Sequence, residues 1–250
     1  MMCKKYQELL FNKRWEEYKQ FFQLEIFRYL VMWFSIVPII AGIIAQLPEP
    51  LNIQIGHQVH PVQLTLPFNW QLLWLSSFFF VLALLIYKIY CPNFIHQYNK
   101  YSDYAAHNHD PRWLTTQVYD LLEFIGMKQH QKDKFIKRLY DKDYLNEVVD
   151  DDENILSHTD PKVESKQTTI RIFYQNKIYE FGMPINSHAE DVERSVFWEV
   201  FGSYSATRLW ARNTIQVLLL ISLILFLVSL LQHIIKGGVF VMHWIGNFFN

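Results

Sequence analysis

An uncharged run of 21 residues, Ile215–Ile235, is the feature that most restricts how this chain can fold. It reads IQVLLLISLILFLVSLLQHII, and its polar interruptions are two serines, two glutamines and one histidine. Crossing the hydrocarbon core of a bilayer, which is ~30 Å thick, takes about 20 apolar residues in helical form. A helix also satisfies its own backbone hydrogen bonds inside lipid. We therefore predict a transmembrane helix over 215–235.

Two earlier windows have similar length and character. Trp70–Tyr90 has tryptophans near its first residue and tyrosines near its last, which suits the two interfaces of a bilayer. Phe27–Leu47 carries an arginine at its edge and a proline in its middle, and membrane helices tolerate both. The alternative for Phe27–Leu47 is a signal peptide, but a polar leader of about 26 residues is too long for one. We expect an uncleaved anchor, and hence three spans.

Lysine and arginine assign an orientation to these spans. Six precede or open the first window, none lies in the Pro48–Asn69 connection, and sixteen lie from Lys88 to Arg212. Cationic side chains gather on the cytoplasmic side of membrane proteins. We therefore expect the N-terminus and the long middle segment in the cytoplasm, and in a bacterial host the protein would lie in the inner membrane. Cys3 and Cys91 both fall on this reducing side, so no disulfide framework is predicted.

The predicted fold class is a mainly α membrane protein with three transmembrane helices and a small α+β cytoplasmic domain, 91–212, inserted between the second and third spans. Apolar spacings of three and four predict a cytoplasmic amphipathic helix within 1–26. Alternation predicts a hairpin over 168–182 and a hairpin-like pair in the external loop 48–69. The remaining segments are helices over 110–126 and 131–149, an acidic loop over 150–166, a helix over 187–212 and an interfacial tail over 236–250.

Two of these helices begin with capping residues. Asp110 is a favourable N-cap, and Pro111 suits the first helical position. Ser187 and Glu190 have the spacing of a capping box. We expect the helix that begins there to continue, either straight or with a kink near Gly202, into the third span. Such a helix would transmit an event in the cytoplasmic domain to the spans. The alternative is that this helix only connects two stable layers.

His107, His109 and Asp110 form the strongest candidate for a metal site, because imidazole nitrogens and a carboxylate can ligate a metal. Their spacing alone is a weak signal, and Asp110 already has a use as an N-cap. We therefore expect no metal and no cofactor. The sequence contains no P-loop, nucleophile elbow, HExxH or dinucleotide glycine pattern, so no catalytic residue and no enzyme activity is predicted.

Small and polar residues within the spans predict where helices associate. In the first span alanines lie one helical turn apart, and in the third span two serines and a histidine share a stripe. The predicted stripe consists of Ala41, Ala45, Ser222, Ser229 and His233. It serves either packing within one chain or assembly of several copies.

The expected function is a non-enzymatic membrane effector or signalling subunit. Its cytoplasmic domain would sense or bind a protein partner, and its helices would oligomerise or perturb the bilayer. This layout is similar, in arrangement alone, to that of membrane effectors of bacterial anti-phage systems. A near-neutral net charge of −1 gives no attraction for nucleic acid. The partner-binding residues are unknown at this stage.

Two other functions compete with this one. A passive accessory subunit would only anchor or assemble a larger membrane complex. A membrane-bound enzyme would act on lipid or nucleotide through His107, His109 and Asp110. The expected partners are the bilayer, a cytoplasmic or membrane protein, and further copies of the same chain.

Overall fold

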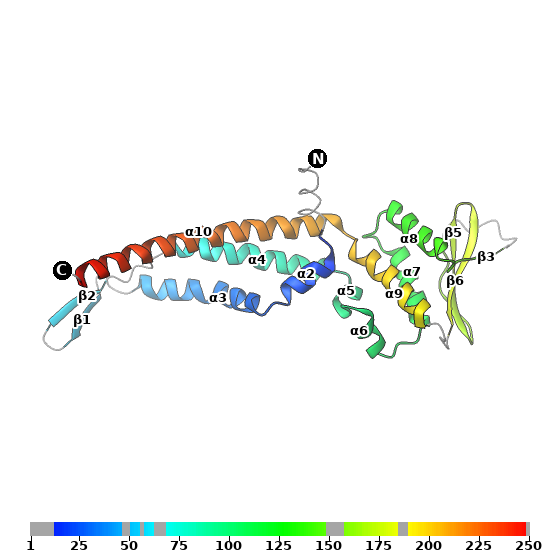
Figure 1. Ribbon diagram of the computed structural model, residues 1–250, viewed down its shortest axis with the longest axis horizontal. Helices are drawn as coiled ribbons and strands as arrows, with labels where there is room; N and C mark the ends of the chain where they lie inside the picture. Colours follow the sequence, from blue (N-terminus) through cyan, green and yellow to red (C-terminus); the bar gives the residue numbers. More distant parts are fainter. Residues whose placement is uncertain are drawn as a thin grey trace. The chain divides into compact units, whose positions relative to one another are not determined.

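The computed structural model describes residues 13–46, 51–55, 58–62, 69–148, 158–184 and 190–248 (Figure 1). The chain divides into two compact units. The apolar unit draws on Met1–Asn12, Gln20–Ile89 and Trp210–Asn250, and the mixed unit on Lys13–Lys19 and Tyr90–Leu209. The described chain is mostly helical with a small antiparallel sheet, which confirms the fold class at this coarse level.

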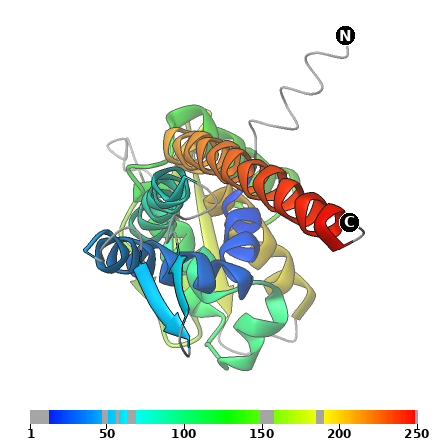
Figure 2. The same ribbon diagram turned by 90° about the vertical axis from the view of Figure 1, so that its left-hand side faces the viewer.

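Long helices and one hairpin make up the apolar unit. Its elements are the second half of α2 (Trp15–Phe22), α3 (Ile26–Ala45), β1 (Leu51–Ile55), β2 (Gln58–Val62), α4 (Trp70–Tyr90) and α10 (Leu209–Phe248). Among the described residues, α4 and the Leu209–Val239 part of α10 are long and apolar enough to cross a membrane. The antiparallel strands β1 and β2 run side by side in both views (Figures 1 and 2).

Serine hydroxyls join α4 to α10 inside the apolar unit. Ser76 Oγ donates to Ser222 O, and Ser222 Oγ donates to Ser76 O, both at 2.8 Å. At the start of α4, the backbone N–H of Asn69 donates to Gln232 Oε1 at 3.2 Å. Asn69 precedes Ser76 in sequence whereas Gln232 follows Ser222, so the two helices run antiparallel.

The length of α10 exceeds that of a single span. Its 40 residues at about 1.5 Å per residue give a helix about 60 Å long, twice the ~30 Å of a bilayer core. Because Gln232 lies beside Asn69, the His233–Phe248 part continues past the start of α4. Through Phe248, the tail that we expected as a separate segment is the last part of this helix.

The mixed unit contains short helices and the four-stranded sheet. Its helices are the first half of α2, α5 (Asn93–Gln97), α6 (Tyr101–Ala106), α7 (Arg112–Glu123), α8 (Gln129–Asp141) and α9 (Glu190–Ser205). Its strands are β3 (Asn146–Val148), β4 (Lys162–Val163), β5 (Gln167–Tyr174) and β6 (Lys177–Pro184). The sheet order is β3-β6-β5-β4, with every neighbouring pair antiparallel.

A tight hairpin organises the sheet. Tyr174 pairs with Lys177, and the two residues between them, Gln175 and Asn176, have φ angles of 51° and 61°. Two consecutive positive φ angles in a two-residue loop match the right-handed twist of paired strands. The hairpin predicted over 168–182 therefore forms, with its turn at Gln175–Asn176.

The core of the mixed unit lies where α7 faces both the sheet and α9. The α7 residues that point into it recur at spacings of three and four, and each is at most 1% exposed: Leu114, Val118, Leu121 and Leu122. Ile170, Ile172 and Phe181 supply the sheet side, with 1% exposure each. The buried residues of α7 recur with the period of a helix, and those of β5 and β6 come from one face of the sheet. Both sets pack together in one apolar layer.

Two expected helices end earlier than predicted, and a residue with positive φ follows the end of each. The helix expected over 131–149 ends at Asp141, Asp143 has a φ of 57°, and β3 follows. The helix expected over 187–212 is described from Glu190 and ends at Ser205. Arg208, with a φ of 48°, separates it from α10, so the expected continuous helix into the third span is wrong. Ser187 lies outside the described residues.

The structure also differs in part from the expected amphipathic helix within 1–26 and from the expected acidic loop over 150–166. Within 1–26, the described residues form α2 and the start of α3, and Trp15 and Tyr18 are 0% and 3% exposed inside the mixed unit. The apolar side of α2 therefore packs against protein there. Within the acidic loop 150–166, residues 158–166 are described; they include β4, and the backbone N–H of Thr159 donates to Arg171 O at 2.9 Å. This part is a strand-edge segment held against β5.

Candidate functional site

The predicted metal candidates do lie close together, but each has another partner. The rings of His107 and His109 stack with centroids 5.5 Å apart, and His109 also stacks on Trp113 at 4.8 Å. His107 Nδ1 donates to Asp103 O at 2.7 Å. The Nε2 atom of His109 shares a 2.9 Å hydrogen bond with the Tyr98 hydroxyl.

Asp110 serves the start of α7. Its Oδ1 accepts from the backbone N–H of Arg112 at 3.0 Å, and its Oδ2 lies 2.8 Å from the guanidinium of the same residue. These hydrogen bonds from Arg112 hold the pKa of the Asp110 carboxyl below its usual range. Within the described part of the chain, no group of three or more His, Cys, Asp or Glu side chains could hold a metal ion. The cluster is thus an aromatic stack next to a carboxylate that binds Arg112; the N-cap of α7 is Pro111, and not Asp110 as the sequence predicted.

The residues of the predicted helix-association stripe are partly buried and partly exposed in the structure. Ser222 and Ser229 are 8% and 4% exposed, and Ala41 of α3 is 8% exposed, so all three pack within the chain. His233 is exposed. The side chain of Ala45 lies outside the described residues. Ser76 of α4, which sequence reasoning did not single out, is the partner of Ser222.

A hollow of about 460 Å³ opens in the mixed unit between α7, α8 and the tip of the β5–β6 hairpin. Its walls combine apolar side chains with amides and opposite charges. The lining residues are Leu122, Gln129, Lys132, Asp133, Ile136, His158, Ile172, Phe173, Tyr174, Gln175 and Asn176. Such a mixture, apolar walls with a few convergent polar groups, is typical of binding sites.

Polar contacts fix one wall of this hollow. His158 Nε2 lies 2.7 Å from Glu123 Oε1, and the Tyr119 hydroxyl donates to Asp160 Oδ1 at 2.6 Å. This hydrogen bond to a carboxylate raises the pKa of Tyr119 to about 12. The segment beginning at His158 is thus tied to α7. Sequence reasoning missed this site, because its residues come from four separate segments without a shared motif.

Lys19 of α2 is a buried cation in the mixed unit. It is 5% exposed, and its Nζ donates to Ile95 O at 2.7 Å and to His96 O at 2.8 Å. The two carbonyls belong to α5, so the ammonium group supplies donors to that short helix. Burial lowers the pKa of Lys19. Trp15, one turn earlier, donates from Nε1 to Thr207 O at 3.0 Å, which ties α2 to the turn that follows α9.

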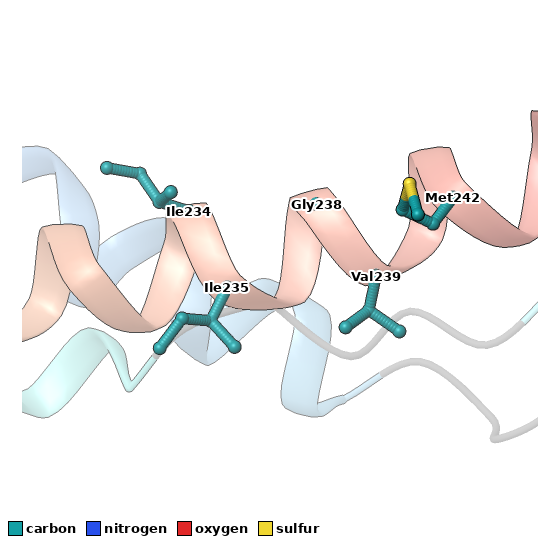
Figure 3. A pocket seen from close by; sticks show the side chains of 5 residues that line it. All are labelled: Ile234, Ile235, Gly238, Val239 and Met242. Atoms are coloured by element: carbon teal, nitrogen blue, oxygen red, sulfur yellow. The ribbon is translucent and has the colours of Figure 1, made fainter.

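A second hollow, of about 430 Å³, lies on the surface of α10 and has no polar side chain among its lining residues. Figure 3 shows Ile234, Ile235, Val239 and Met242 projecting from successive turns around Gly238. All five described lining residues come from one helix. A depression of this kind offers apolar contact but no group that could orient a small ligand or do chemistry.

The chain matches no protein-family model, no curated protein and no solved structure.

Proposed function

We propose that this chain is an integral membrane protein whose mixed unit lies in the cytoplasm and binds a protein partner there. In this proposal α3, α4 and α10 are the spans, and the protein acts through binding rather than through catalysis. The apolar surface of α10 is the observation that carries it.

That surface is uncovered over most of its length. Only 17% of the apolar window of α10 is buried inside the chain, and for α4 the share is 28%. The helix of a soluble core would be mostly covered, and exposed apolar patches of this extent indicate contact with lipid or another protein. Aliphatic side chains that are 40% or more exposed on α10 include Leu220, Leu223, Ile224, Leu227, Leu231, Ile234 and Ile235. A bilayer supplies apolar contact on all of these sides at once.

The distribution of cationic residues supports the orientation. The mixed unit and its borders carry sixteen lysines and arginines between Lys88 and Arg212, whereas the Pro48–Asn69 connection carries none. Cytoplasmic loops of membrane proteins show this excess. Ser76 of α4 and Ser222 of α10 also bind each other rather than lipid.

The hollow between α7, α8 and the β5–β6 hairpin is the proposed partner site. It is the described region in which apolar side chains, amides and both charge signs converge. Lys132 lines it, whereas Lys134, on the same helix, is exposed and is not among its lining residues. These two lysines give a matched pair of variants.

Three measurements on the full chain test the proposal. The protein should resist extraction from membranes by alkaline carbonate, and a cysteine placed at Asn176 should react with a thiol reagent only after the cytoplasmic side is opened. Extraction by carbonate would disprove the membrane location. A partner co-purified in mild detergent should be lost with Lys132→Glu and kept with Lys134→Glu. Equal capture by both variants would exclude the hollow as the partner site.

An effector and a passive subunit predict different effects on cells. An effector that perturbs the bilayer should depolarise cells when it is overproduced, and depolarisation should require α10. A subunit that only anchors a complex should be harmless at every expression level. A voltage-sensitive dye measured during induction separates the two.

A further inference from the structure

The loop between α7 and α8 carries a fully exposed aliphatic side chain. Ile125 is 99% exposed, and in the described part of the mixed unit the next most exposed aliphatic residue is Val163, at 71%. A single exposed apolar side chain is common on soluble proteins and by itself has no meaning. What distinguishes Ile125 is the place that its loop occupies in the mixed unit.

Arg208, which precedes α10 in the chain, holds this loop within the mixed unit. The backbone N–H of Arg208 donates to Gly126 O at 3.2 Å, and its guanidinium carbon lies 4.7 Å from the ring centre of Phe124. A Cβ atom at Gly126 would come within 2.8 Å of Arg208 Cγ, so glycine allows this close approach. The two residues that flank Ile125 are therefore both in contact with Arg208.

Arg208 also binds the end of α4. Its guanidinium donates to Tyr90 O at 2.7 Å, and its Cζ lies 5.6 Å from the centre of the Tyr90 ring. Tyr90 is the last residue of α4, and the residue after Arg208, Leu209, is the first of α10. Arg208 thus contacts both the α7–α8 loop and Tyr90, the residue at which the chain enters the mixed unit, and it lies one residue before the point at which the chain leaves that unit.

We propose that Ile125 inserts into the headgroup region of an anionic phospholipid bilayer, so that the α7–α8 loop is a second lipid contact of the protein. This inference rests on the proposed function, since the ends of α4 and α10 mark the membrane surface only if these helices cross it. Lys128, exposed three residues after Ile125, supplies a cation for acidic headgroups. An aliphatic tip beside a flexible cation is the chemistry that an interface of acyl chains and phosphates accommodates.

Fluorescence quenching on the full chain in vesicles tests the inference. Cys3→Ser and Cys91→Ala remove the native thiols, and single cysteines then replace Ile125, Val163 or Leu223 and carry an environment-sensitive fluorophore. The vesicles contain phosphatidylcholine and phosphatidylglycerol with brominated acyl chains. We expect blue-shifted emission that brominated lipid quenches at positions 125 and 223. At position 163 we expect emission that iodide quenches and brominated lipid does not.

The three labelled positions distinguish failure of the proposed function from failure of the lipid contact at Ile125. A probe at 223 that lipid does not quench would remove the proposed function itself. A probe at 223 that lipid quenches, together with a probe at 125 that behaves like that at 163, would overturn only the lipid contact of the loop. Protection of position 125 from both quenchers would show that protein covers it, and would also overturn the inference. Equal quenching at 125 in vesicles without phosphatidylglycerol would overturn the preference for acidic lipid.

Discussion

Ser76 and Ser222 exchange hydrogen bonds between two antiparallel apolar helices: each hydroxyl donates to the backbone carbonyl of the other residue at 2.8 Å. The two oxygen atoms of the hydroxyls lie 3.3 Å apart. Ser76 and Ser222 are 4% and 8% exposed, so they bring α4 and α10 close while both hydroxyls stay covered. A reciprocal pair of this kind selects one register of the two helices, because a shift of one residue would break both bonds.

Removing this pair is expected to weaken the association of α4 with α10. Ser76→Ala and Ser222→Ala should each destabilise the folded chain in detergent by about 0.5–1 kcal/mol, the usual contribution of such bonds between membrane helices. Unfolding in increasing dodecyl sulfate, followed by circular dichroism, measures the loss. Ser77→Ala is the matched control, since the Ser77 hydroxyl donates to Leu73 O of its own helix. A double variant whose loss equals the sum of the two single losses would show that the serines do not interact.

Lys19→Met is expected to destabilise the mixed unit. The substitution keeps an aliphatic side chain of similar length but leaves the carbonyls of Ile95 and His96 without their donor, which costs about 1–3 kcal/mol. Chemical unfolding followed by tryptophan fluorescence gives the difference. Lys134→Met, on the exposed face of α8, should change the free energy of unfolding by less than about 0.5 kcal/mol. Similar values for both lysines would contradict the role assigned to Lys19.

Glu199→Gln should loosen α9 from α8. The carboxylate of Glu199 is 15% exposed and pairs with Arg138 at 2.7 Å and Lys142 at 2.9 Å. Loss of its charge leaves two partly buried cations side by side, and we expect a loss of about 1–2 kcal/mol in the free energy of unfolding. Glu147→Gln serves as control, because its pair with Lys177 is about half exposed and should contribute less than about 0.5 kcal/mol.

The mixed unit is expected to lose stability in alkali. Burial raises the pKa values of Tyr98, Tyr104 and Tyr204, whereas tyrosine in an unfolded chain ionises near pH ~10. A group whose pKa is raised in the folded state contributes stability that is present below the unfolded pKa and lost as pH rises through the folded one. Lys19, whose pKa is lowered, has the opposite effect below pH ~10.4. Burial raises the pKa of Tyr179 as well, so these phenols outweigh Lys19 and we predict a net loss of stability above pH ~10.

Urea unfolding at a series of alkaline pH values measures this dependence. Tyr204→Phe should reduce the loss per pH unit, because the buried phenol of Tyr204 is then absent. An unchanged slope in that variant would exclude Tyr204 as a source of the pH dependence.

His109→Ala should weaken the fold without any dependence on metal. The imidazole stacks on Trp113 and bonds to Tyr98, so its removal should cost about 1 kcal/mol. The same thermal transition is expected with and without a chelator for the unchanged protein. A transition that shifts upward on addition of zinc, and does so only when His107 and His109 are both present, would restore the metal hypothesis.

The sequence alone was sufficient to predict the elements that depend on local composition. The apolar run Trp70–Tyr90 forms one helix with those bounds, because no glycine or proline interrupts it. The hairpin of β5 and β6 followed from the alternation over 168–182. In both cases, neighbours along the chain supply the interactions that decide the structure.

Tertiary contacts decided the rest. Arg208 adopts a left-handed backbone between α9 and α10, where its side chain contacts Tyr90 and Phe124, residues far from it in sequence. The stretch 146–148 becomes a strand because β6 offers a free edge, which no helical periodicity reveals. Burial of Lys19 and the partner of Ser222 likewise depend on segments brought together only by folding. Composition determines which segments avoid water, and long-range pairing determines where each helix stops and what its polar groups bind.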